Sequence, residues 1–179
     1  LLAAFSLCFS GCAASHEAIR QEHSAELFAM GTYMSLTAYG EQAEAALNEA
    51  ESSVTEWEAL WSATEESSEI YAANHSHGEA VPLSPETEEL LRFALKMAEQ
   101  TRGALDPTIY PLVNAWGFIN QEYRVPSEQE ITELLSLTGY EKVVLENHAV
   151  TLPEGTQLDL GAVGKGYTGE LLAEYLKEQ

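Results

Sequence analysis

The sequence predicts an α+β fold in which a mixed or antiparallel sheet packs against helices. Two observations lead to this class. Apolar residues recur at three- and four-residue spacing over long segments, as in amphipathic helices. Short segments rich in β-branched and aromatic residues are bounded by turn signals, which is typical of hairpins. With 179 residues, the chain is long enough for one domain with a hydrophobic core, or for a large piece of a bigger one.

The first half of the chain is expected to hold a strand region and two helices. Residues 27–40 predict one or two strands around Gly31. Residues 42–61 place their apolar side chains on one helical face. Residues 62–82 are rich in serine and interrupted by glycine and proline, so we expect a loop. A second helix should begin at Ser84, an N-cap followed by proline, and stop at Gly103.

The second half is expected to add short helices and then strands. Residues 107–116 predict a short helical segment or a set of tight turns. Ser127 and Glu130 have capping-box spacing and open another helix. The remaining predicted elements, in order, are strands at 142–146 and 149–152 joined by a hairpin turn at Asn147 and His148, a third strand at 157–160, a glycine-rich turn at 161–169 and a final helix.

The charge of the chain is strongly negative. Its 29 acidic and 8 basic residues give a formal net charge of -21. Such a surface repels phosphate backbones, so we expect no binding to nucleic acid. It also argues against a broad basic face that docks on anionic lipid.

The first residues resemble an export signal. Residues 1–12 are apolar and too short to span a bilayer as a stable helix. Their end, Phe9-Ser10-Gly11-Cys12, resembles a bacterial lipobox, in which Cys12 is lipidated and becomes the mature N-terminus; an ordinary signal with a chance cysteine is the alternative. Residues 13–26 are then expected to be a polar tether before a folded domain at 27–179. Cys8 and Cys12 are the only cysteines, which excludes a disulfide framework.

The most informative segment is 159–167, with the sequence DLGAVGKGY. A strand is expected to end there and a helix to begin, so free N–H groups and the helix dipole favour a bound anion. Lys165 adds a positive charge that suits a phosphate, and Asp159 can accept hydrogen bonds from a ligand. The carbonyl of Ala162 can face a hard cation. A simple glycine-rich strand-to-helix turn is the alternative.

Two well-known phosphate motifs do not account for this segment. Gly164, Gly166 and Gly169 match the spacing of the dinucleotide fingerprint, but its diagnostic acidic residue would lie beyond the end of the chain. The P-loop requires glycine where Asp159 stands and serine or threonine where Gly166 stands. The glycine-rich segment is therefore neither motif.

Two further segments combine a turn with chemistry. In residues 103–108, GALDPT, a rigid turn can hold main-chain groups against a planar heterocycle; a structural turn capped by Asp106 is the alternative. In residues 30–32, Gly31 permits close backbone approach, against the alternative of a bulge in an edge strand. The five histidines lack the helical spacing of metal ligands, so we expect no zinc or catalytic role for them.

Taken together and in order, the segments of this chain resemble the ApbE family. They are Met30-Gly31-Thr32, Ser68-Glu69-Ile70 with Asn74, Gly103-Ala104-Leu105-Asp106-Pro107-Thr108, Trp116-Gly117-Phe118, and the glycine-rich segment that begins at Leu158 and ends at Tyr167. The resemblance covers residues 27–179 and implies an ApbE-like α+β fold.

The resemblance implies specific contacts to FAD and Mg²⁺. It assigns FAD contacts to Met30, to Ala104, Leu105 and Asp106, and to Asp159 and Lys165. Thr64 stands in the loop where the family has a FAD-contacting aromatic. The carbonyl of Ala162 is the implied Mg²⁺ ligand. The family's other metal ligands, an Asp and a Thr, lie on a later segment beyond Gln179, so we expect a domain truncated at its C-terminus that is inactive as a fragment.

The implied activity is Mg²⁺-dependent transfer of FMN from FAD to a Thr or Ser hydroxyl of an exported acceptor protein, with release of AMP. An enzyme of this kind that carries a lipid anchor would face the periplasm. Within the family, the alternative is a FAD pyrophosphatase that releases FMN and AMP. Outside catalysis, the alternatives are a lipid-anchored flavin-binding protein and a solute-binding lipoprotein without flavin.

Overall fold

The computed structural model describes residues 21–179. The expected signal at 1–12, including Cys12, lies outside the described residues. The helices are α1 (Ala43–Trp61), α2 (Glu69–Asn74), α3 (Pro85–Gln100), α4 (Tyr110–Ala115), α5 (Glu128–Leu135) and α6 (Gly161–Glu178), with a 3₁₀ turn at Tyr140–Lys142. The strands are β1 (Glu22–Ala29), β2 (Thr32–Tyr39), β3 (Val81–Pro82), β4 (Val144–Glu146) and β5 (Ala149–Thr151). This mixture confirms the predicted α+β class.

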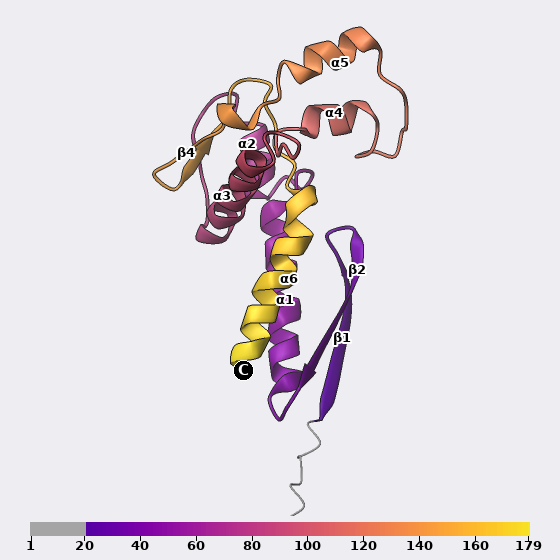
Figure 1. The fold of residues 1–179 in the computed structure, drawn as a ribbon, viewed down its shortest axis with the longest axis vertical. Coiled ribbons are helices and arrows are strands. Elements are labelled where there is room, and N and C mark those ends of the chain that lie inside the picture. The colour runs from indigo at the N-terminus through magenta and orange to yellow at the C-terminus, as the bar shows by residue number, and fades with distance from the viewer. Residues whose placement is uncertain (1–20) are drawn as a thin grey trace, which may run out of the picture.

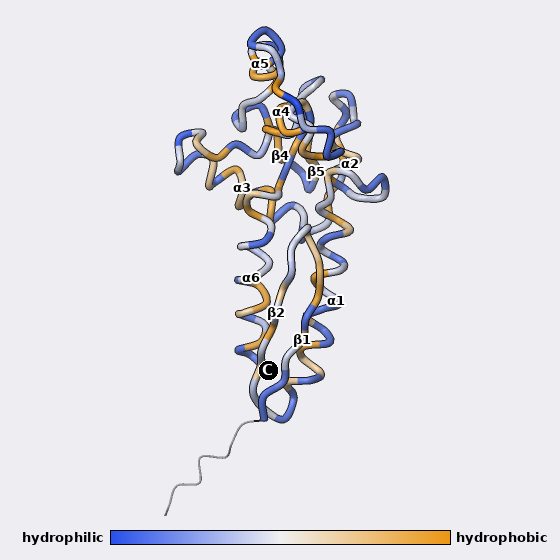
Figure 2. The backbone as a smooth tube through the Cα atoms, turned by 90° about the vertical axis from the view of Figure 1, so that its right-hand side faces the viewer, coloured by the Kyte–Doolittle hydropathy of each residue, from blue (hydrophilic) through white to orange (hydrophobic). Residues whose placement is uncertain are grey.

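The molecule has an elongated lower part and a wider upper part (Figure 1). In the lower part, α1 and α6 lie side by side and the hairpin of β1 and β2 runs along them. The upper part holds α2 to α5 and the small sheet of β3, β5 and β4 (Figure 2). The N-terminal end of α6 lies where the two parts meet.

The first predicted strand region forms an antiparallel hairpin. Residues Met30 and Gly31 make its two-residue turn, with φ of 51° and 68°, and this turn geometry matches the right-handed twist of the strands. The strand begins at Glu22, so the prediction that a polar tether extends to residue 26 is wrong at this end. Along β1, exposed side chains alternate with half-buried or buried ones, and the strand packs against α1. This alternation makes the polar segment a strand.

The second predicted hairpin is also confirmed. β4 and β5 are antiparallel and joined by Asn147 and His148, both with positive φ. β3 pairs with the other side of β5. The predicted third strand at 157–160 is wrong, because the segment forms only an isolated bridge between Ile109 and Gln157. Its remaining backbone groups have other partners, described below.

Two predictions about loops are wrong. The expected loop at 62–82 contains α2, which Ser68 caps by accepting a hydrogen bond from the Tyr71 N–H at 2.9 Å. The expected glycine-rich turn at 161–169 is the beginning of α6. Burial of Val163, Thr168 and Leu172 of this helix offsets the low helix propensity of its glycines.

The core lies beneath α2, α3 and the small sheet. Its fully buried members include Ile70, Leu90, Leu91, Val150, Leu152 and Leu158. Burial of this cluster fixes the segment that leads into α6, because Leu158 is part of it. No helix within residues 21–179 is long and apolar enough to cross a membrane.

Ser127 and Glu130 contact each other at the start of α5, as their capping-box spacing predicted. Ser127 Oγ accepts the Glu130 N–H at 3.2 Å, as predicted. The carboxylate of Glu130 pairs with the Arg124 guanidinium, which lowers its pKa, and a hydrogen bond from the Ser127 backbone lowers that pKa further. The start of α5 is thereby fastened to the preceding loop.

Candidate functional site

Two adjoining cavities lie where α6 begins. The first has a volume of about 280 Å³ and the second about 460 Å³. The first is lined by Met30, Gly31, Glu58, Trp61, Ser62, Ala63, Thr64, Asp159, Leu160, Gly161, Gly164 and Lys165. The second is lined by Gly103, Ala104, Leu105, Asp106, Pro107, Ile109, Val113, Asp159, Ala162 and Val163. Asp159 lines both cavities and therefore stands between them.

The candidate residues of the sequence analysis divide between these cavities. Met30, Thr64 and Lys165 lie in the first, although they come from the hairpin turn, the loop after α1 and α6. The loop segment of Ala104, Leu105 and Asp106 lies in the second, together with Ala162. The structure thus brings together all the predicted FAD and metal positions, which are far apart in the sequence.

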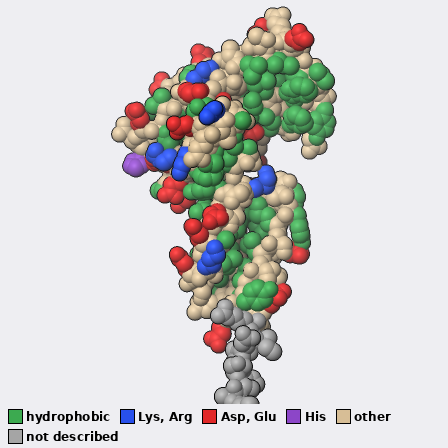
Figure 3. All heavy atoms as spheres, in the orientation of Figure 1, with side chains coloured by type: hydrophobic (Ala, Val, Ile, Leu, Met, Phe, Trp, Pro, Cys, Tyr) green, Lys and Arg blue, Asp and Glu red, His purple; other side chains and the backbone are tan. Residues whose placement is uncertain are grey.

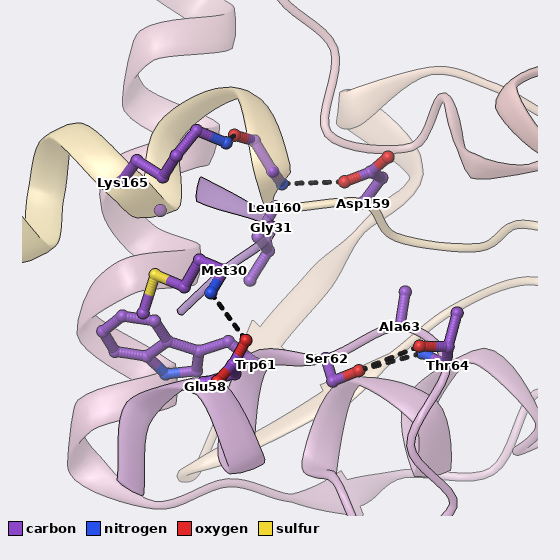
Figure 4. Close-up of a pocket in the computed structure, with 12 residues that line it drawn as sticks. Met30, Gly31, Glu58, Trp61, Ser62, Ala63, Thr64, Asp159, Leu160 and Lys165 are labelled. Atoms are coloured by element: carbon purple, nitrogen blue, oxygen red, sulfur yellow. Dashed lines mark hydrogen bonds between the residues drawn. The ribbon is translucent and has the colours of Figure 1, made fainter. Parts of the chain in front are cut away.

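The first cavity ends on the N-terminus of α6 (Figure 4). The N-terminal turn of a helix carries free N–H groups and partial positive charge, which favour an anion. Lys165 is exposed in this turn, with its Nζ 3.3 Å from the Gly161 carbonyl oxygen. Asp159 Oδ1 accepts the Gly161 N–H at 2.7 Å, and a Cβ at Gly161 would lie 2.9 Å from that oxygen. A side chain at position 161 would therefore require the Asp159 carboxylate to move.

The opposite wall of the first cavity is the hairpin turn. Glu58 Oε1 accepts the N–H of Met30 at 2.6 Å, which anchors a residue in the left-handed conformation (Figure 4). The Thr168 hydroxyl lies 3.6 Å from the Met30 sulfur and links the turn to α6. Glu58 was not recognised in the sequence, since an acidic residue on an amphipathic helix is usually a solvated one.

One aromatic residue, Trp61, lines the first cavity, and two other aromatic rings pack against it. Trp61 stacks on Trp57 with ring centres 5.6 Å apart, and Tyr167 meets Trp61 edge to face. Trp61 is buried, and its indole N–H has no hydrogen-bond partner among residues 21–179. Thr64 sits at the exposed rim, where its hydroxyl contacts Ser62 Oγ at 3.2 Å. An aromatic at position 64 would cover this rim, and threonine leaves it open.

The second cavity is built on the loop of residues 103–108. Asp106 Oδ1 accepts the Thr108 N–H at 2.9 Å and the Thr108 hydroxyl at 2.6 Å. Its other oxygen accepts the Tyr140 N–H at 3.3 Å, and Thr108 Oγ1 accepts the Gly139 N–H at 2.7 Å. The Asp106 carboxylate is thus used to hold the loop, whose residues 103–107 line the second cavity. The loop is therefore a structural turn capped by Asp106, and it also forms a wall of the second cavity.

The donors available to a metal are few in the described part of the chain. Within residues 21–179, no group of three or more His, Cys, Asp or Glu side chains could hold a metal ion. Asp159 and Ala162 both line the second cavity; the carboxylate of the first and the carbonyl of the second are oxygen ligands of the type that Mg²⁺ prefers. These two residues fit part of a magnesium site. Near them, burial raises the pKa of Tyr110 and the charge of Asp159 raises it further, so this phenol remains neutral at physiological pH.

A third hollow lies away from these cavities. His75 and His77 line it with Asn114 and Glu154. His75 stacks on Tyr71 with ring centres 3.9 Å apart, and its Nδ1 lies 2.7 Å from the Tyr71 carbonyl oxygen. These contacts give His75 a structural role.

Comparison with protein families gives a match over nearly all the described residues. The model of the ApbE family matches residues 30–179. A FAD:protein FMN transferase of Vibrio cholerae is 34% identical over 110 residues, which are 59% of this chain and 32% of that protein. The FAD:protein FMN transferase of Salmonella typhimurium is 29% identical over 194 residues, covering 100% of this chain and 55% of that protein. The chain spans about half the length, or less, of the curated relatives it matches.

Solved structures give the same match. The ApbE protein of Thermotoga maritima superposes with a TM-score of 0.82 at 30% identity, over 87% of this chain and 52% of that one. The flavin transferase ApbE of Vibrio cholerae gives a TM-score of 0.79 at 25% identity, over 89% of this chain and 54% of that one. The flavinyl transferase ApbE of Pseudomonas stutzeri, at 24% identity and a TM-score of 0.81, supports the fold alone.

Proposed function

Because the chain belongs to the ApbE family, we propose that its protein transfers FMN from FAD to a Thr or Ser hydroxyl of an acceptor protein. One observation carries the proposal. The residues that the family resemblance assigns to FAD, from Met30 in a hairpin to Lys165 in a helix, line two cavities that meet at Asp159. An extended ligand with two aromatic ends and a charged centre fits such a pair of cavities.

The chemistry of the walls suits the parts of FAD. Lys165 and the N-terminus of α6 provide positive charge for the pyrophosphate. Trp61 and Leu160 give the first cavity apolar surface, and Leu105, Ile109 and Val163 do the same for the second. Asp159 can accept hydrogen bonds from hydroxyl or N–H groups of the ligand.

The proposed reaction is a phosphoryl transfer. The acceptor hydroxyl oxygen bonds to the phosphorus of the FMN half while the bond from that phosphorus to the AMP oxygen breaks. AMP leaves, and the hydroxyl proton is lost. Lys165 and the helix terminus stabilise the negative charge that develops on the phosphate oxygens. Mg²⁺, when bound, would neutralise more of this charge, and Asp159 and the Ala162 carbonyl are the groups of this chain that would hold it.

The test is covalent labelling. The full-length gene product is incubated with FAD, Mg²⁺ and a candidate exported acceptor, and the acceptor is examined by mass spectrometry for an FMN adduct. Lys165→Met should lower adduct formation at least tenfold, since a charge-assisted hydrogen bond contributes about 1.5–3 kcal/mol. Lys177→Met, at the far end of α6, is the matched control and should leave the rate unchanged.

The outcomes separate the functions considered. AMP release without an adduct would show a pyrophosphatase and contradict the transferase. Tight FAD retention without AMP would show a non-catalytic flavin-binding protein. Omission of Mg²⁺ with EDTA present should abolish both products if the metal is required.

We also propose that the protein is exported and anchored by lipid on Cys12, facing the periplasm. The support is the lipobox-like sequence at residues 9–12, and the acceptor would then be an exported protein. Metabolic labelling with a radioactive fatty acid and membrane fractionation test this. Cys12→Ala should remove the label and release the protein from membranes, whereas Cys8→Ala should not. Unchanged labelling of the Cys12 variant would rule out this anchor.

A further inference from the structure

Asn74, the last residue of α2, makes an unusual pair of hydrogen bonds across the molecule. Its Nδ2 donates to the Leu158 carbonyl oxygen at 2.9 Å, and its Oδ1 accepts the Leu158 N–H at 2.6 Å. Asn74 is 8% exposed and Leu158 is fully buried. A side-chain amide here satisfies both backbone groups of one residue, as a neighbouring strand would.

This pair gives Leu158 the backbone partners that a strand would provide, although residues 157–160 form no strand. Leu158 has no ladder partner, and unpaired backbone groups at a fully buried residue are costly. Asn74 replaces the missing strand. The next residue is held from the other side, since the Asp159 N–H donates to the Pro107 carbonyl oxygen at 2.7 Å.

The position of Asn74 is itself fixed. Its helix is capped by Ser68, and Ile70 and Ala73 of the same helix are buried in the core. The Gln157 side chain donates to the Asn74 carbonyl oxygen at 3.2 Å. Asn74 is therefore held rigidly enough to determine where Leu158 lies.

We propose that Asn74 is a positioning residue for the flavin site, which it serves by fixing Asp159 and the start of α6. Leu158 is bonded to Asn74, Asp159 follows directly and stands between the two cavities, and α6 begins at Gly161. Asn74 itself lines neither cavity and acts through the backbone. The proposal rests on the proposed function, because the site that Asn74 would position is the one assigned to FAD.

Hydrogen exchange tests the structural step without any ligand. In the full-length gene product, Asn74→Ala should make the amides of residues 157–161 exchange at least tenfold faster, since two buried hydrogen bonds are lost and both backbone groups of Leu158 are left unpaired. Exchange in α1 and α3 should stay unchanged. Asn48→Ala, an exposed asparagine of α1, is the matched control. Wild-type protection of residues 157–161 in the Asn74 variant would overturn the proposal.

Asn74→Asp is the second variant, in case the alanine variant does not fold. Aspartate keeps the shape of the side chain and the oxygen that accepts the Leu158 N–H. It replaces the Nδ2 donor by a second oxygen, which would face the Leu158 carbonyl oxygen. Unfolding of both variants, seen as loss of near-ultraviolet circular dichroism, would make Asn74 a general stability residue and overturn a specific positioning role.

A double-mutant cycle tests the functional step. Asn74→Asp should weaken FAD binding about tenfold, measured by quenching of flavin fluorescence. In an Asp159→Ala background the same change should have little further effect, because the group that it displaces is already gone. Additive losses would overturn the proposal. Failure of the wild type to bind FAD would instead contradict the proposed function, and exchange at residues 157–161 would still decide the role of Asn74.

Discussion

Among the threonine hydroxyls that form hydrogen bonds in the loops around the site, that of Thr108 should contribute most to the stability of the fold. Thr108 is fully buried and makes two bonds with this one oxygen: it donates to Asp106 Oδ1 at 2.6 Å and accepts the Gly139 N–H at 2.7 Å. We predict that Thr108→Val, which preserves the shape, destabilises the protein by about 3 kcal/mol. A bond to a charged group contributes about 1.5–3 kcal/mol, and the unpaired Gly139 N–H adds about 1 kcal/mol because it is only half-buried.

The assay is unfolding by urea and by heat. A loss of 1 kcal/mol lowers the melting temperature of a domain of this size by about 2–4 °C, so a drop of roughly 6–12 °C is expected. Thr132→Val is the control: its hydroxyl also donates a hydrogen bond, to the Glu128 carbonyl at 2.8 Å, but it is exposed on α5. The control should change stability by less than about 0.5 kcal/mol. Equal, small effects of the two substitutions would refute the reasoning that this loop is held by Thr108.

Three other substitutions probe separate features. Gly117→Ala would place a Cβ 2.1 Å from the Glu122 carbonyl oxygen at a φ of +78°, so urea unfolding should show a loss of more than about 2 kcal/mol. At Gly169 in α6 a Cβ would meet nothing within 4 Å, so Gly169→Ala should raise stability by up to about 1 kcal/mol; a loss would mean that this face of the helix is occupied. His148 holds the pKa of Glu88 below its ordinary value of 4.5 through a hydrogen bond. The stability that the ionised Glu88 contributes is therefore present above pH 4.5 and is lost as the pH falls through the lowered pKa. The difference in unfolding midpoint between the wild type and Glu88→Gln should shrink on acidification. A difference that stays constant with pH would contradict this.

Local patterns predicted most of the fold. The helix at 43–61 and both hairpins follow from short-range rules, since apolar periodicity and turn residues act within a few positions. The beginning of β1 was placed too late because residues 22–26 contain no large apolar side chain that would mark a strand. The third strand was wrong because its pairing partner is a side chain, Asn74, 84 positions away. Periodicity in one segment cannot report a partner at that distance.

The candidate site was predicted as a set of residues, and its connections were not. The glycine-rich segment and the loop at 103–108 stand out by composition, and the structure places both at Asp159. Glu58 did not stand out, and Asn74 entered only as one residue of the family resemblance with no role assigned to it, because a carboxylate or an amide on a helix has many ordinary uses. Their importance comes from the backbone N–H groups that they accept, that of Met30 for Glu58 and that of Leu158 for Asn74. The roles assigned to Met30, Thr64 and Lys165 in FAD binding remain predictions.

The glycines at the start of α6 have a thermodynamic consequence. Each one disfavours a helix by about 1 kcal/mol relative to alanine, and Gly161, Gly164, Gly166 and Gly169 all lie in its first half. This end of the helix therefore has little intrinsic tendency to form. An anion that binds there would satisfy its free N–H groups and favour the helical state. Ligand binding and helix order are then linked equilibria, and saturating ligand should raise the melting temperature of the protein while slowing exchange in residues 161–169.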